Sequence, residues 1–178
     1  MPSRPPPYDA VLLTGTVGAG KTTTAHALSA LELAHGRRHA VVDLDEIRLL
    51  RPPPPDDRFA HEVELANLRD LARNFRAAGA TRLVLAGVVE DAREVPRYAA
   101  AIDGRLLLCR LSVDPVLVRD RLRSRHRDDP DLLAWHLDRT VELTGILDAD
   151  PFEDLRVDTT GRTPQDVARE VARAAGWA

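Results

Sequence analysis

The sequence has few of the features that mark secreted, membrane or nucleic-acid-binding proteins. Its 178 residues include one cysteine, Cys109, which excludes an internal disulfide. No apolar run approaches the length of a membrane span, and residues 1–9 have prolines where a signal peptide would be apolar. A net charge of -3 lacks the basic excess of general nucleic-acid binders. These absences predict a cytoplasmic protein whose partner is neither a membrane nor a nucleic acid.

Lysine is almost absent as well. The chain has 25 basic residues, and Lys21 is the only lysine beside 24 arginines. A guanine-specific switch needs a lysine in its Asn-Lys-x-Asp motif, so a GTPase of that class is excluded. Because lysine is used at this single position, we infer that a compact ammonium group is needed there rather than a planar guanidinium.

What the sequence does contain is an alternation of apolar runs and helical patterns. This alternation predicts an α/β fold in which a parallel sheet lies between two layers of helices, and the length fits one domain over residues 1–178. The expected strands cover residues 10–14, 39–43, 82–89, 105–111 and 155–157. The expected helices cover residues 21–34, 58–78, 95–101, 115–127, 131–147 and 164–175. Two proline-rich segments interrupt the pattern and predict a disordered arm at residues 1–8 and a loop at residues 51–57.

Residues 15–22 match the phosphate-binding pattern G-x-x-x-x-G-K-[ST], with an apolar strand before them and an Ala/Leu-rich helix after them. Glycines allow the backbone N–H groups of such a loop to converge on phosphate oxygens, and the helix N-terminus adds its dipole. We expect Lys21 to bind the β- and γ-phosphates of ATP, Thr22 to ligate Mg²⁺ and Thr23 to contact the α-phosphate. The predicted nucleotide-binding residues of this loop are Gly15, Val17, Gly18, Ala19, Gly20, Lys21, Thr22 and Thr23.

Two carboxylates follow the second expected strand. Asp43 and Asp45 fall at the carboxyl edge of the sheet, where ligands bind in open α/β folds. If the strand conformation continued, both would point to one face, because they are two residues apart. Asp43 is then a candidate for holding Mg²⁺ through water. Asp45 is a candidate for the acceptor hydroxyl, either as its ligand or as its general base.

In this order the motifs resemble those of the P-loop small-molecule kinases, the group that includes shikimate, gluconate and adenylylsulfate kinases and chloramphenicol phosphotransferase. The resemblance spans nearly the whole chain and rests on the phosphate loop, on Asp43-Leu44-Asp45 with Arg48, and on Arg119-Asp120-Arg121-Leu122-Arg123-Ser124-Arg125. It implies a three-layer fold with a five-stranded parallel sheet in the order 2-3-1-4-5, ATP as phosphoryl donor, and an arginine-rich lid over about residues 114–130. The triple glycine of shikimate kinases is missing, which argues against shikimate as the acceptor.

Four further residues are candidates for the site. Arg121 and Arg125 share a helix face beside an apolar line, so we expect both to meet the nucleotide, with Arg125 stabilising charge on the transferring phosphoryl group. Arg162, near the C-terminus, is a candidate for stacking on adenine, because the resemblance places its loop beside the base. Glu90, after the third strand, joins Arg48 as a candidate for acceptor binding.

Together these features predict ATP- and Mg²⁺-dependent transfer of a γ-phosphoryl group to a small molecule, by a monomer or a homodimer. Two alternatives remain open. In a regulatory P-loop ATPase, Asp45 and Glu46 would polarise water instead of an acceptor. In a nucleotide monophosphate kinase, the acceptor would itself be a nucleotide. The sequence does not identify the acceptor.

Overall fold

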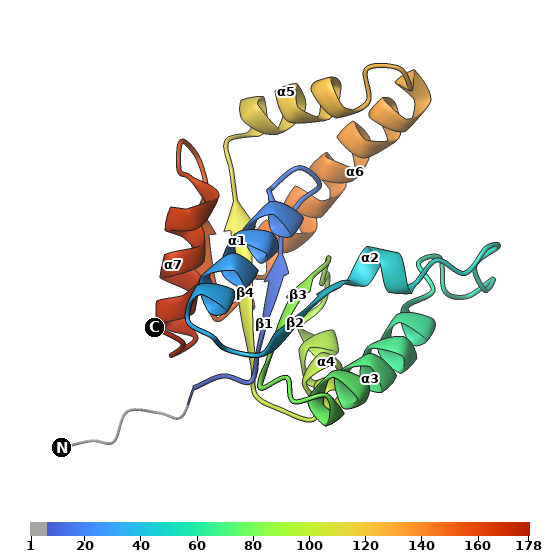
Figure 1. The fold of residues 1–178 in the computed structure, drawn as a ribbon. Helices are drawn as coiled ribbons and strands as arrows, with labels where there is room; N and C mark the ends of the chain where they lie inside the picture. Colours follow the sequence, from blue (N-terminus) through green and yellow to red (C-terminus); the bar gives the residue numbers. More distant parts are fainter. Residues whose placement is uncertain (1–6) are drawn as a thin grey trace.

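A computed structural model describes residues 7–178 of the chain and contains one five-stranded sheet with helices on both faces (Figure 1). The strands are β1 (Ala10–Thr14), β2 (His39–Asp43), β3 (Arg82–Ala86), β4 (Leu106–Ser112) and β5 (Leu155–Asp158). All pairings are parallel, and the strand order is β2-β3-β1-β4-β5. The predicted sheet and its order 2-3-1-4-5 are therefore confirmed.

Seven α-helices and one 3-10 turn connect the strands of the described region. They are α1 (Lys21–Ala34), α2 (Leu44–Ile47), α3 (His61–Ala77), η1 (Ala92–Glu94), α4 (Val95–Ile102), α5 (Pro115–Arg125), α6 (Pro130–Ala149) and α7 (Pro164–Ala174). In Figure 1, α1 and α7 lie on one side of the sheet, α3 and α4 lie on the other, and α5 and α6 extend beyond its carboxyl edge.

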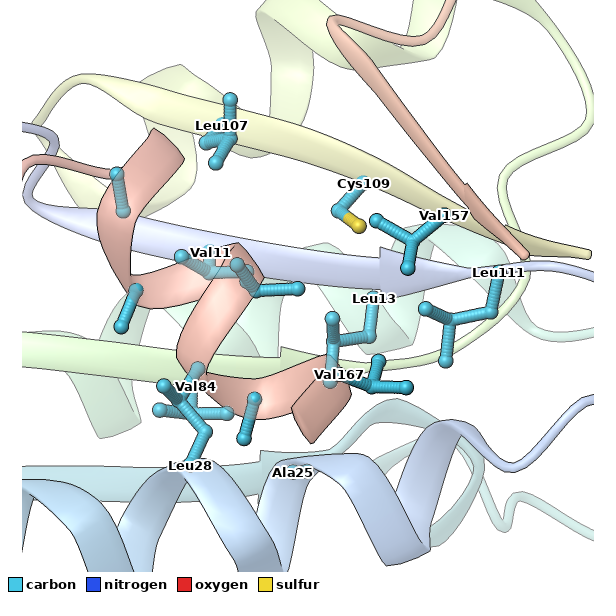
Figure 2. Packing of buried hydrophobic residues seen from close by; sticks show 14 of the residues in the cluster. Val11, Leu13, Ala25, Leu28, Val84, Leu107, Cys109, Leu111, Val157 and Val167 are labelled. Atoms are coloured by element: carbon cyan, nitrogen blue, oxygen red, sulfur yellow. The ribbon is translucent and has the colours of Figure 1, made fainter. Parts of the chain in front are cut away.

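Alternate residues of the central strands serve the two faces of the sheet. Val11 and Leu13 pack toward α1 and α7, where they meet Leu28 and Val167 (Figure 2). Leu12, between them, faces the opposite core under α3 and α4. Because both faces are covered by helices, β1, β3 and β4 are nearly continuous apolar runs, whereas the edge strands β2 and β5 are only partly buried. This burial makes the sheet a rigid base for the loops at its carboxyl edge.

The expected elements differ from the observed ones mainly at their ends. β3 stops at Ala86 rather than at residue 89, because the chain then leaves the sheet and Val89 donates its N–H to the hydroxyl of Thr14 (3.0 Å). α3 begins at His61 rather than at residue 58, because Ala60 before it is left-handed (φ 52°). The four-residue helix α2 was not expected, and residues 51–57 have no regular structure, as predicted.

Both ends of the described chain meet at the opposite edge of the sheet. The predicted disordered arm covers residues 1–8, of which residues 1–6 lie outside the described part of the chain. Tyr8, within that arm, is held instead: it donates its N–H to Ala175 O (3.0 Å), and its carbonyl accepts the indole N–H of Trp177 (2.7 Å). Across residues 7–178, no helix is both long enough and apolar enough to span a membrane.

Candidate active site

The phosphate-binding loop joins β1 to α1 at the carboxyl edge of the sheet. Gly15, Gly18 and Gly20 have φ values of 138°, 80° and 94°, in the left-handed region that glycine adopts without strain. Gly15 also needs its lack of a side chain, because a Cβ there would lie 2.4 Å from the carbonyl oxygen of Leu111. The glycines of the motif therefore shape the loop, as the pattern predicted.

Lys21 lies over this loop at the first turn of α1. Its ammonium donates hydrogen bonds to Gly15 O and Thr16 O, each at 3.0 Å. Burial lowers its pKa from 10.5 to about 8, against the raising effect of the Asp45 and Asp43 carboxylates. Lys21 is thus a compact, partly desolvated cation beside the groups that were expected to contact phosphate.

β2 ends at Asp43 and α2 begins at Leu44, so the strand does not continue to Asp45 and the condition for the two carboxylates to share one strand face is not met. Asp43 is the N-cap of α2: its Oδ1 accepts the N–H of Asp45 (3.1 Å), while its Oδ2 accepts the hydroxyl hydrogen of Thr22 (3.0 Å). Asp45 instead lines the adjoining cavity. The turn into α2 separates the two carboxylates, so that one meets the phosphate loop and the other the cavity.

Arg48 follows α2 and is held between two carboxylates. One guanidinium nitrogen bonds to Asp45, and another lies 3.3 Å from Oε2 of Glu64. Glu64, from α3, is 1% exposed and also accepts the hydroxyl hydrogen of Tyr98. Arg48 was expected to bind the acceptor, and in the structure two carboxylates already balance its charge.

Glu90 lines the same cavity and pairs with a residue that the sequence analysis missed. Arg139 of α6 bonds to Glu90 and to Glu142 (2.7 Å), and its guanidinium lies 4.9 Å from the ring centre of Phe59. Arg139 is 6% exposed, so its guanidinium is buried, while the carboxylates of Glu90 and Glu142 that hold it remain partly exposed. The helical spacing of residues in α6 could have indicated which face of this helix lines the cavity. The residues of α6 that line the cavity recur at intervals of three or four, and they are Leu132, Trp135, His136, Arg139 and Leu143.

The arginine-rich segment forms α5, which begins at the cap Asp114 and presents one face to the phosphate loop. Arg121 donates to Gly18 O (3.1 Å), and Arg125 lines the cavities on both sides of the loop. Arg119 and Arg123 are exposed, and Arg123 pairs with Asp120 (3.6 Å). The structure therefore brings Arg121 and Arg125 to the loop, the two arginines that the spacing had indicated.

The loop after β5 borders the other side of the phosphate loop. Arg162 lines a cavity there, and its guanidinium pairs with Glu170 (2.7 Å). Thr163 caps α7, since its hydroxyl accepts the N–H of Asp166 (3.2 Å) and Pro164 follows it at the first helical position. Arg162 is thus on the rim of this cavity.

Two cavities meet at the phosphate loop. The larger, of about 630 Å³, is lined by Lys21, by Asp45 of α2, by the segments after α2, before α3 and after β3, and by one face of α6. The smaller, of about 450 Å³, lies between α1, α5 and the start of α7. Both are lined by Gly18, Gly20, Thr23 and Arg125. The loop is therefore open to one compartment on each side.

Comparisons with known proteins agree with this architecture. A family model described as an AAA domain matches residues 11–141. The tunicamycin resistance protein of Deinococcus radiodurans is 23% identical with a TM-score of 0.63, over 95% of this chain and 96% of that one. The APS kinase of Mycobacterium tuberculosis, solved with AMPPNP and APS, is 24% identical with a TM-score of 0.58, over 95% and 98% of the two chains. No curated protein matches the chain.

Shikimate kinase from Acinetobacter baumannii, solved with shikimate, shares the same arrangement at 20% identity and a TM-score of 0.57, over 93% of this chain and 92% of that one. At such identities the likeness concerns the fold alone. The fold is that of the small-molecule kinases which the motifs resembled, so that resemblance is confirmed at this level.

Proposed function

The chain belongs to the AAA domain family of P-loop proteins, and on this basis we propose that it is a kinase which transfers the γ-phosphoryl group of ATP to a hydroxyl group of a small molecule. The observation that carries this proposal is the pair of cavities that share the phosphate loop. A donor and an acceptor need separate compartments that meet at the transferred phosphoryl group. A nucleotide hydrolase needs only one compartment and a water molecule.

On the donor side, we assign the smaller cavity to the adenosine part of ATP, with Arg162 on its rim. The loop N–H groups and Lys21 then bind the phosphates. The hydroxyl of Thr22 and the carboxylate of Asp43, which are hydrogen-bonded to each other, are oxygen donors of the kind that Mg²⁺ takes beside phosphate and water. Magnesium bound there with ATP would neutralise phosphate charge during transfer.

On the acceptor side, we assign the larger cavity to the substrate. Asp45 is the carboxylate that can accept the hydrogen of the attacking hydroxyl, as its ligand or as its base, since half of its side chain is exposed to this cavity. Arg48 holds that carboxylate from the side of α2, and Glu90 offers a second oxygen acceptor across the cavity.

We further assign residues 114–130 to a lid that carries Arg121 and Arg125 over the phosphates. Arg125 lines both cavities, so it can meet charge as the phosphoryl group passes between them. We expect residues 1–178 to act as one domain, in the cytoplasm, as a monomer or homodimer.

A screen of ATP consumption tests this function. Purified protein with MgATP is offered sugars, sugar acids, nucleosides, nucleotides, and aminoglycoside- or phenicol-type antibiotics, and ADP formation is measured against a sample without acceptor. We expect ADP to form only with a particular acceptor, and Lys21→Ala to abolish it while the protein stays folded. Equal ADP formation without any acceptor would instead support a regulatory ATPase. Transfer to nucleotides alone would make the protein a nucleotide monophosphate kinase.

A further inference from the structure

The exposed large apolar side chains of the described residues are unevenly distributed. Eight such side chains are exposed, and four of them line the larger cavity. These four are Leu49, Leu50, Leu132 and Trp135, which are 56%, 44%, 39% and 44% exposed. The other four lie on α1, α5 and the outer side of α6. Single exposed apolar residues are ordinary, but a group that converges on one cavity marks a binding surface.

These four side chains come from two separate elements. Leu49 and Leu50 follow α2, whereas Leu132 and Trp135 are three residues apart on one face of α6. Phe59, two residues before α3, lies between them in sequence and lines the same cavity. Because the apolar side chains come from two separate parts of the chain, they can contact a ligand from two sides.

Beyond the phosphate loop, two cations of this cavity are balanced by carboxylates. Arg48 lies between Asp45 and Glu64, and Arg139 lies between Glu90 and Glu142. An acceptor with several charges would have to break these pairs, whereas hydroxyl groups can bond to them as they stand. Of the other cations that line the cavity, we assign Lys21 and Arg125 to the phosphates of ATP, and Arg51 and Arg58 are exposed to solvent, which screens their charge.

The size of the cavity also exceeds the needs of the phosphoryl group. Its volume of about 630 Å³ falls within the range of sites that hold whole small molecules, while the adenosine part of ATP is assigned to the other cavity. The space beyond Lys21 and Asp45 is therefore left for the acceptor.

We propose that the acceptor is an amphipathic small molecule: a hydroxyl-bearing end lies against Asp45 and Glu90, and an apolar or aromatic group lies against Leu49, Leu50, Leu132 and Trp135. This proposal rests on the kinase assignment for its orientation. Such a surface selects by burying apolar area, which favours a substrate that carries the group over the same polar end without it.

Two probes that share a polar end test the apolar surface without any turnover. Methyl β-D-glucopyranoside and phenyl β-D-glucopyranoside are titrated into the full chain, with and without AMPPNP and Mg²⁺, and heats of binding are measured. We expect the phenyl compound to bind at least about tenfold more tightly, as is usual for an added apolar group in a matching pocket. Equal affinities would overturn the proposal. Tighter binding of 6-phosphogluconate than of the phenyl compound would also overturn it, in favour of an anionic acceptor.

Two variants of α6 locate the effect. Trp135→Ala should reduce the ratio of the two affinities toward one, whereas Val141→Ala, at a residue 68% exposed on the same helix and outside the cavity lining, should leave the ratio unchanged. Leu50→Ala should also reduce the ratio. Because Leu50 lies outside the helices, this variant shows that the effect does not come from a disturbed α6. If Trp135→Ala weakened both glucosides equally, the apolar surface would serve lid closure and the proposal would fail. The ratio does not depend on phosphoryl transfer, so a failed kinase assay would leave it measurable.

Discussion

Replacing Lys21 by methionine should stabilise the ligand-free protein while it removes phosphate binding. Burial lowers the pKa of Lys21 from 10.5 to about 8, and a difference of this size corresponds to roughly 3 kcal/mol for keeping the ammonium charged in the fold. Methionine has a similar length and no charge. It loses the hydrogen bonds to Gly15 O and Thr16 O, which contribute on the order of 1 kcal/mol each. We therefore expect a net gain of about 1 kcal/mol at pH 7, or ~2–4 °C in Tm.

The sign of the pH dependence makes this prediction specific. Between pH 8 and 10.5 the unfolded chain binds the Lys21 proton and the folded chain does not, so the stability of the wild-type protein rises with pH across this window. The advantage of Lys21→Met should therefore be full at pH 7 and disappear toward pH 10.5. Thermal unfolding at both pH values measures it, with the exposed Arg119→Met as a control that should show no such trend.

Nucleotide provides the second half of the same assay. A ligand at 100 times its Kd stabilises a protein by ~2.7 kcal/mol, so MgATP should raise the Tm of the wild-type protein by several degrees and leave Lys21→Met unchanged. A lower Tm for Lys21→Met at pH 7, or a difference from wild type that is the same at both pH values, would refute the argument that Lys21 is a desolvated cation held for phosphate.

Three further substitutions separate the roles proposed for the site. Arg125→Ala should lower kcat by ~10³ or more while ATP affinity changes little. Arg119→Ala, on the other face of α5, should change the activation free energy by no more than ~0.5 kcal/mol. If neither variant changes the steady-state kinetics, the lid role is wrong. Asp45→Asn should lower kcat by ~10²–10⁴ if the carboxylate is the base, and normal turnover would move that role to another group. Gly15→Ala should lower the free energy of unfolding in urea by at least roughly 2 kcal/mol, because the new Cβ would lie 2.4 Å from Leu111 O.

The fold could be predicted largely from local patterns. The strands are short apolar runs bounded by turn residues, and each buried run is the direct consequence of helices on both faces of the sheet. The strand order came from the resemblance, since periodicity alone does not fix which strands are neighbours. The helix α2 escaped notice because four residues are too few for a helical period, and it forms because Asp43 caps it.

The groups that we assign to the donor side could also be predicted from local patterns. Its groups come from contiguous segments: residues 15–22 form the loop, and the spacing of four between Arg121 and Arg125 places both on one helix face. Asp43 was also a candidate because it ends the second strand, although the strand does not continue to Asp45. Its contact with Thr22 depends on the end of β2 lying beside α1, as the parallel sheet requires.

The groups assigned to the acceptor side were harder to predict from the sequence, because only tertiary packing brings them together. Arg139 reaches Glu90 across 49 positions of sequence, and no local motif contains both. Glu64 left a weak signal, as a carboxylate on the apolar face of α3, four residues before the buried Leu68. Its partners Arg48 and Tyr98 come from other elements, so their pairing needed the structure.

The arrangement of these cations distinguishes the phosphate loop from the part of the larger cavity beside α6. Lys21, Arg121 and Arg125 surround the loop and have no carboxylate within ion-pair distance among residues 7–178, and Lys21 and Arg121 donate hydrogen bonds to loop carbonyls. On the acceptor side, Arg48 and Arg139 are each paired with two carboxylates. Unpaired cations attract a polyanion strongly, whereas balanced pairs offer mainly hydrogen bonds. We therefore expect the phosphates of ATP to bind at the loop, and the part of the larger cavity beside Arg48 and Arg139 to take a molecule of low charge.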